Sequence, residues 1–99
     1  MAWLFVKQPN GKLARFSDIV DNITHFNLSV EDAFAICKEH KMGKRESEIK
    51  VQGALDDWRP WSDQVEGDGT TRLRYCLKKI RNRHGSDAVD LVCKEMESN

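Results

Sequence analysis

The sequence predicts an α+β fold in which an N-terminal β-hairpin packs on three to four α-helices, in a single small domain spanning residues 1–99. A turn signal lies between two short apolar and basic arms near the N-terminus. From residue 70 onward, apolar residues recur at helical spacing almost to the C-terminus. A chain of 99 residues has the usual size of one domain and can bury a core without a metal or a disulfide.

The hairpin is predicted over residues 3–16 from the segment VKQPNGKLARFS, residues 6–17. Pro9 sets φ for the first central position of a turn, Asn10 tolerates the second, and Gly11 supplies a left-handed residue. A two-residue Asn10-Gly11 loop would place Pro9 where a paired N–H is required, and proline has none. We therefore predict strands at 3–7 and 12–16, joined by a type I turn and a glycine bulge.

An isolated hairpin is only marginally stable in water, so one of its faces should lie on helices. Trp3, Phe5 and Phe16 are the predicted buried side chains. Residues 17–28 carry no regular pattern, and we expect an irregular connection there with at most one helical turn near 17–20.

Four helices are predicted, at about 29–42, 45–59, 71–84 and 86–97. Ser29 is a good N-cap for the first helix, and Ala33, Phe34 and Cys37 are expected to face inward. Residues 44–53 are ambiguous, because EIKVQ alternates like a strand. A longer helical face of Val51, Ala54, Leu55 and Trp58 favours a helix, in which Gly53 costs about 1 kcal/mol.

The third and fourth helices have the clearest signals. Leu73, Cys76, Leu77 and Ile80 fall at i, i+3, i+4 and i+7, which predicts one buried stripe. Gly85 is a good C-terminal stop between the two helices. The predicted inward face of the last helix consists of Val89, Val92, Cys93 and Met96.

Sixteen basic residues balance sixteen acidic ones, so no global field draws the protein to nucleic acid or to a membrane. The N-terminus shows neither a signal-peptide pattern nor a membrane-spanning run. The cysteines are odd in number and widely spaced, which argues against a disulfide framework. We therefore expect a cytoplasmic protein with reduced thiols.

The third predicted helix is rich in cations and has no acidic residue between 72 and 84. At 100° per residue, Arg74, Lys78 and Arg81 lie on one flank of the apolar stripe, and Arg72, Lys79 and Arg83 on the other. Two interpretations stay open. The flanks are a binding surface for phosphates or an acidic protein, or they are a solvated face whose charges pair with acids such as Asp56, Asp57, Asp87 and Asp90.

A second candidate surface is DDWRPWSDQ, residues 56–64, with the acidic loop after it. Arg59 and Trp61 have the composition of a binding hot spot. Asp63 and Glu66 could bind in the basic channel with which a partner protein holds nucleic acid, so the acidic loop would mimic nucleic acid.

Catalysis and metal binding have weak sequence support. Cys37 and His40 lie at i, i+3, but nothing marks an oxyanion site or an orienting acid. The other thiols lie on the apolar stripes, where buried cysteine is common. A structural zinc site usually shows two pairs of ligands, and only one pair is present. We expect no catalytic residue, no metal and no cofactor.

Residues 6 to about 41 resemble the opening of a group of short uncharacterised proteins encoded by phages and prophages of Firmicutes. The matching positions are Lys7–Gly11 (KQPNG), Arg15–Ser17 (RFS), Asp21, Thr24 and Asn27–Ser29 (NLS). Weaker similarity runs through RPW, residues 59–61, whereas residues 70–85 do not match the tail of the group. The resemblance implies a phage accessory protein in a cytoplasmic setting. It implies no activity and carries over no catalytic residue.

We therefore expect a non-catalytic phage or prophage accessory protein that binds and antagonises a host protein, in particular part of an immune system such as a CRISPR ribonucleoprotein. The alternative is a nucleic-acid- or nucleotide-binding accessory protein that acts through the basic helix 72–84. A metal- or thiol-dependent enzyme has the least support. No membrane partner is expected, and a homodimer through an exposed hairpin edge stays open.

Overall fold

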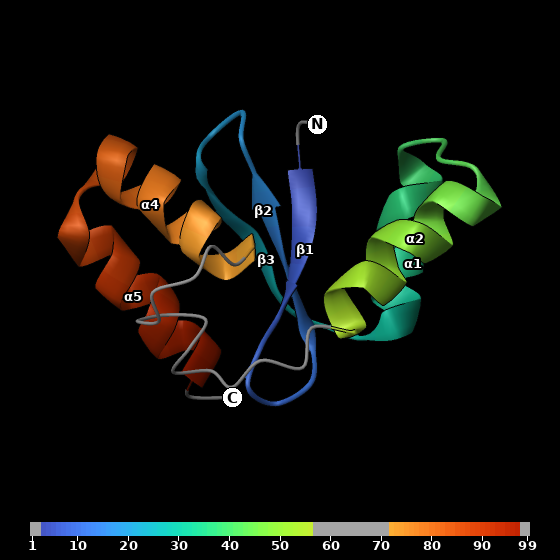
Figure 1. Ribbon diagram of the computed structural model, residues 1–99, viewed down its shortest axis with the longest axis horizontal. Coiled ribbons are helices and arrows are strands. Elements are labelled where there is room, and N and C mark those ends of the chain that lie inside the picture. Colours follow the sequence, from blue (N-terminus) through green and yellow to red (C-terminus); the bar gives the residue numbers. More distant parts are fainter. Residues whose placement is uncertain (1–2, 57–71, 98–99) are drawn as a thin grey trace.

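The computed structural model describes residues 3–56 and 72–97, and it confirms the α+β class there. The strands form one antiparallel sheet in the order β1-β2-β3. Helices α1 and α2 cover one face of this sheet, and α4 and α5 cover the other (Figure 1). The elements are β1 Trp3–Lys7, β2 Leu13–Ser17, β3 Asn22–Leu28, α1 Val30–Glu39, α2 Lys44–Leu55, α4 Arg72–His84 and α5 Ser86–Glu97.

The predicted hairpin is confirmed, including its turn. The Gly11 N–H donates to the Gln8 carbonyl at 3.0 Å, and the Gln8 N–H donates to the Lys12 carbonyl at 2.8 Å. Gly11 has φ +84°, the left-handed value that a glycine bulge requires. The Asn10 side-chain oxygen accepts from the Lys12 N–H at 2.9 Å, which fixes the turn further.

The expectation of an irregular segment at 17–28 was wrong, because residues 22–28 form β3, an edge strand paired with β2. Arg15 pairs with His25 and Phe16 with Ile23, so Thr24 is an extra residue in a β-bulge. The bulge removes the alternation of apolar and polar residues that would have revealed a strand. In place of a helical turn, a turn at 18–21 connects β2 to β3.

The hairpin turn is also fastened to the far end of β3. Gln8 is only 2% exposed, and its side-chain oxygen accepts from the Asn27 N–H at 2.8 Å. Its amide nitrogen donates to the Asn27 side-chain oxygen at 2.9 Å. Asn27 has φ +57°, a conformation that asparagine adopts more readily than most residues.

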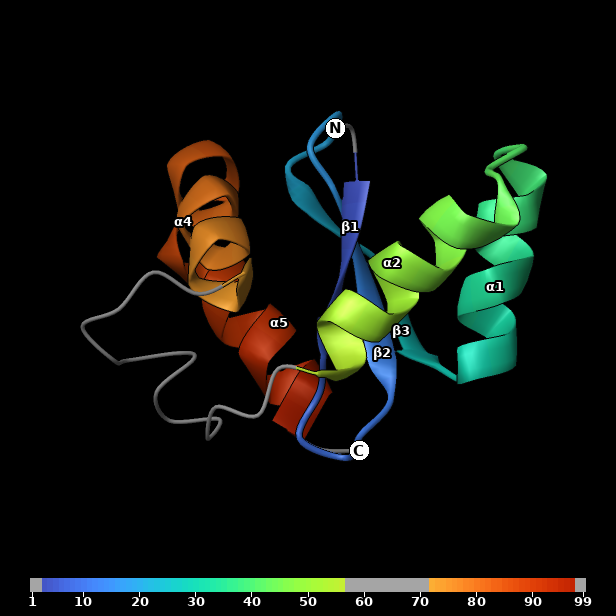
Figure 2. The ribbon, with the colours of Figure 1, turned by 45° about the vertical axis from the view of Figure 1, so that its right-hand side comes forward.

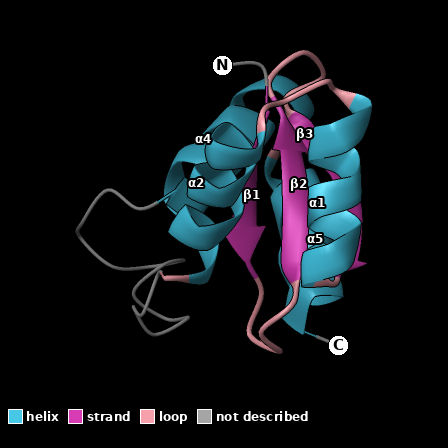
Figure 3. Cartoon of the chain, turned by 90° about the vertical axis from the view of Figure 1, so that its right-hand side faces the viewer, coloured by secondary structure: helices cyan, strands magenta, loops and turns pink. Residues whose placement is uncertain are grey.

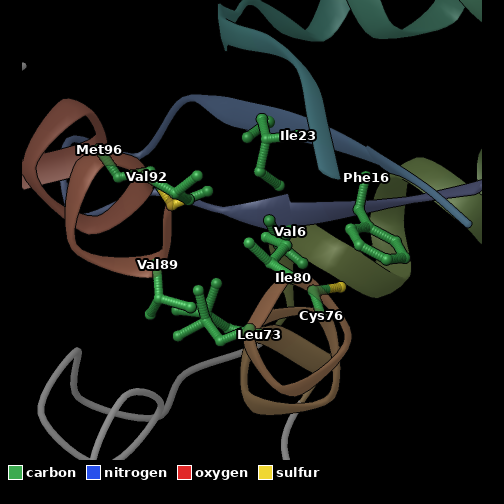
Figure 4. Close-up of a cluster of buried hydrophobic side chains, with 11 residues drawn as sticks. Val6, Phe16, Ile23, Leu73, Cys76, Ile80, Val89, Val92 and Met96 are labelled. Atoms are coloured by element: carbon green, nitrogen blue, oxygen red, sulfur yellow. The ribbon is translucent and has the colours of Figure 1, made fainter. Parts of the chain in front are cut away.

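Both faces of the sheet are buried, whereas the sequence predicted only one. The α4–α5 core joins sheet residues such as Val6, Phe16 and Ile23 to α4 and α5 (Figure 4). The α1–α2 core joins Trp3 and Phe5 to α1 and α2. Figure 2 shows the two helical pairs on opposite sides of the strands, and Figure 3 views the strands from the side of α1 and α2. Trp3, Phe5 and Phe16 are buried as predicted.

Helix α1 begins as the sequence predicts and ends earlier. The Ser29 hydroxyl accepts from the Asp32 N–H at 3.0 Å, and the Asp32 carboxylate accepts from the Ser29 N–H at 3.1 Å, which is a capping box. Chain reversal occurs at Lys41, which has φ +56°, so the helix does not extend to residue 42. The inward position of Phe34 was wrong: its side chain is 37% exposed, and Ile36 is buried instead.

Residues 44–53 are helical, which resolves their ambiguity. A Cβ atom at Gly53 would lie 2.8 Å from Nη2 of Arg72, so the glycine in α2 gives the Arg72 side chain room to cross it. The predicted extension of this helix to residue 59 was wrong, because α2 ends at Leu55 and Asp56 is its C-cap. Helices α4 and α5 match their predictions closely, and Gly85 between them has φ +94°.

Candidate functional site

The buried stripe of α4 is confirmed, and it fixes the direction of the cations on either side. Leu73, Cys76, Leu77 and Ile80 all lie in the α4–α5 core. We call Arg72, Lys79 and Arg83 the Arg72 flank, and Arg74, Lys78 and Arg81 the Arg74 flank. The two flanks have different surroundings in the folded protein.

The Arg72 flank contacts the rest of the fold. Arg83 Nη1 lies 3.4 Å from the Asp21 carboxylate and also donates to the Ile19 carbonyl at 3.4 Å. Next to it, His84 Nε2 lies 2.8 Å from the Val20 carbonyl oxygen. The α4 C-terminus therefore holds the turn between β2 and β3. The ion pair is made with Asp21, an acid that the sequence did not suggest.

Lys79 on the same flank also has partners. Its ammonium lies 5.4 Å from the centre of the Tyr75 ring. Hydrogen bonding to Tyr75 raises the pKa of Lys79, and the nearby charges of Asp21 and Asp18 act in the same direction. The solvated-face interpretation thus describes the Arg72 flank well.

The Arg74 flank differs from the Arg72 flank in its contacts and not in its exposure, because each flank has two exposed cations and one half-buried cation. Lys78 and Arg81 are exposed, and neither forms an ion pair within residues 3–56 and 72–97. Arg74 is half-buried and has contacts of its own. The exposed cations of α4 without an ion pair in the described ranges are therefore Lys78 and Arg81 on this flank and Arg72 on the other, where the Arg72 side chain lies against Gly53 of α2.

The second surface predicted from the sequence, formed by Arg59, Trp61, Asp63 and Glu66, lies outside the described residues.

The thiols are part of the packing. Cys37 and Cys76 are buried and Cys93 is half-buried. Burial raises the pKa of Cys76 to about 12, so its thiol stays protonated and is a poor nucleophile at neutral pH. In the described ranges, no three His, Cys, Asp or Glu side chains gather closely enough to hold a metal ion. His40 contacts Trp3 and Arg15, with its ring centroid 5.0 Å from that of Trp3.

A group of polar and cationic side chains around Trp3 was missed from the sequence. We call it the Trp3 cluster. The Arg15 guanidinium carbon lies 4.8 Å from the centre of the Trp3 ring, and Lys50 Nζ lies 4.3 Å from it. The cluster consists of Trp3, Arg15, Thr24, His25, His40 and Lys50.

Hydrogen bonds connect this cluster across β2, β3 and the end of α1. Arg15 Nη1 donates to Thr24 Oγ1 at 3.1 Å, and Nη2 lies 3.4 Å from His40 Nε2. Thr24 Oγ1 lies 2.9 Å from His25 Nδ1. Because Arg15 stays charged, it must donate to His40, whose Nε2 is then the acceptor.

Part of this cluster had a signal in the sequence. Phe5 pairs with Arg15, so Trp3 lies diagonally across the hairpin from Arg15 on the same face. Thr24 and His25 could not be added, because their strand was not predicted. His40 joins the cluster only through the packing of α1 on the sheet.

Comparisons with known proteins gave no match among protein-family models, curated proteins or solved structures. None of the helices in the described ranges combines the length and the apolar character needed to cross a membrane.

Proposed function

We propose that the protein is a non-catalytic binding protein that antagonises a host component, in particular an immune ribonucleoprotein such as a CRISPR effector. It docks through the Arg74 flank of α4 on an acidic surface of that partner. The observation that carries the proposal is the difference between the flanks. Arg83 and Lys79 are engaged by the turn at 18–21 and by Tyr75, whereas Lys78 and Arg81 are exposed without an ion pair in the described ranges.

Exposed cations that make no internal pair add little to the stability of a fold, but they contribute to the rate and specificity of association with an acidic partner. The resemblance of residues 6–41 to phage and prophage proteins supports a host target. A target of this kind would place the protein in the cytoplasm of a bacterial host cell.

The test is inhibition of purified CRISPR effectors in a target-cleavage reaction. Wild-type protein should inhibit at a near-stoichiometric ratio, and K78E/R81E should be at least tenfold less potent. The matched control is K44E/R45E, which makes the same charge change at exposed positions in the first turn of α2 and should inhibit like the wild type. Equal potency of the two double variants would contradict the role of the flank. Absence of inhibition across a panel of effector types would contradict the choice of target.

Nucleic acid is the second candidate partner, and Tyr75 is the observation that favours it. Its side chain is 44% exposed beside Lys79, and an exposed aromatic ring next to cations can stack on a base. Binding to single-stranded or duplex DNA, followed over a salt series, distinguishes the candidates. Phosphate contacts should give a log–log slope of about one unit per phosphate neutralised.

A further inference from the structure

We propose that the Trp3 cluster is a binding site for a phosphate group, held by Arg15 together with His25 and His40. Nothing in this proposal depends on the function proposed for α4. Arg15 belongs to the opposite face of the sheet, beside Trp3 and the α1–α2 core.

Arg15 has no counter-ion among the described residues. It is half-buried, and loss of hydration lowers its pKa without an opposing effect from a carboxylate. Within the described ranges, no Asp or Glu side chain pairs with Arg15, His25 or His40. Desolvated charges in proteins are normally paired. The Trp3 ring attracts the cation but offers no oxygen acceptor.

The Arg15 guanidinium group also has N–H donors that no described residue uses. A guanidinium group has five N–H donors in a fixed plane. One on Nη1 is used by Thr24 and one on Nη2 by His40, which leaves one N–H on each terminal nitrogen and the N–H of Nε, which is buried without a partner. Two parallel N–H groups of this kind match two oxygens of a phosphate.

The two histidines of the Trp3 cluster, His25 and His40, are accessible to a ligand. Thr24, His25 and His40 are all exposed, so a ligand can reach them from solvent. A protonated His40 would repel Arg15 at their present separation of 3.4 Å. An oxyanion between the two side chains removes that repulsion: it replaces the Arg15–His40 hydrogen bond and accepts one hydrogen bond from each side chain. Lys50, with Nζ 4.3 Å from the Trp3 ring centre, adds to the positive potential.

A phosphate suits this arrangement better than a carboxylate does. It is tetrahedral and carries up to two negative charges, so it can contact donors from β2, β3 and the end of α1 together. A carboxylate is planar and has a single charge, and it would satisfy Arg15 alone. The ligand is therefore either free phosphate or the phosphate of a small organic ester.

The experiment is a titration of the isotopically labelled protein with sodium phosphate, compared with sodium chloride at equal ionic strength. The Arg15 Nε–H and the His25 and His40 ring signals are followed by NMR. Phosphate should shift these signals in a saturable manner, and chloride should not. Signals that respond equally to both salts would overturn the proposal.

Variants then test which groups bind. R15K keeps the charge but loses the fork and should weaken phosphate binding about tenfold, as expected for a charge-assisted hydrogen bond. R45K makes the same change at an exposed position of α2 and should bind like the wild type. H40Q changes an exposed side chain, so it should fold normally and still bind more weakly. If R15K and H40Q bind phosphate as tightly as R45K, the site is not the Trp3 cluster.

Sulfate isolates the role of the histidines, because it remains a dianion between pH 5.5 and 8. H25Q/H40Q should therefore bind sulfate more weakly than the wild type at the same pH, and equal affinity would overturn the role of the histidines. A nucleoside monophosphate that binds more tightly than phosphate would identify an organic ester as the ligand, and weaker binding would identify the free anion.

Discussion

Gly11 gives the sharpest test of the hairpin. Its φ of +84° is unfavourable for most residues that carry a Cβ atom, and asparagine tolerates it best. A Cβ atom at this position would have no heavy atom within 4 Å, so steric clash plays no part. The left-handed conformation costs a residue with a Cβ atom about 1–2 kcal/mol. Alanine recovers about 0.4–1 kcal/mol of this by restricting the unfolded chain.

We therefore expect Gly11→Ala to lower the free energy of unfolding by about 1 kcal/mol, which for a domain of this size lowers Tm by about 4–8 °C. Gly11→Val should be worse because its side chain is β-branched, and Gly11→Asn should be the mildest. The assay is thermal and urea unfolding followed by circular dichroism. Gly43→Asn is the matched control for Gly11→Asn, since Gly43 has φ −65°, open space at its Cβ, and an N-cap position that asparagine suits. Its effect should stay within about 0.5 kcal/mol. A Gly11→Val protein that melts with the wild type would refute the bulged turn as a source of stability.

Three further predictions concern the thiols and a helix cap. The folded protein holds the Cys76 proton up to a pKa of about 12, against an ordinary 9.0, so the unfolded chain binds fewer protons between these values. The contribution of the Cys76 thiol to the free energy of unfolding should be fully present below pH 9 and should be lost as the pH rises toward 12. Urea midpoints across that range should therefore fall less in Cys76→Ala than in the wild type. Replacing Cys37, Cys76 and Cys93 together by alanine should reduce stability but leave partner binding intact at low temperature. Chelators should have no effect on the wild type or on this triple variant, and unfolding of the wild type in a chelator would show a structural metal. Ser29→Ala removes the capping box of α1 and should cost about 1 kcal/mol in urea unfolding, and a loss below the measurement error would mean that the box adds nothing.

The sequence predicted those parts of the fold whose determinants are local. The turn at Pro9–Gly11, the Ser29 cap, the stripe of α4 and the stop at Gly85 each depend on residues close together in the chain. β3 depends on a pairing partner, and its bulge at Thr24 removes the period of two that identifies a strand. The prediction that Phe34 is buried failed for a similar reason, because the packing of α1 on the sheet decides which of its faces points inward.

The candidate sites divide in the same way. The two flanks of α4 follow from helix geometry once the buried stripe between them is known. The sequence could not show which flank forms an ion pair within the fold, because Asp21 lies 62 residues from its partner Arg83 along the chain. The Trp3 cluster combines β1, β2, β3, α1 and α2, and no spacing rule connects residues so far apart.

The burial of the sheet on both faces has a consequence for how the protein tolerates change. The α4–α5 core and the α1–α2 core join the sheet to different helical pairs, which lie on opposite sides of the strands (Figure 1). Substitutions such as Ile80→Val and Val51→Ala should therefore have additive energies, since distant sites without shared partners do not couple. Each helical pair can then vary its outer surface while the other half of the molecule keeps its stability. Such independence suits a scaffold whose opposite sides adapt to different ligands.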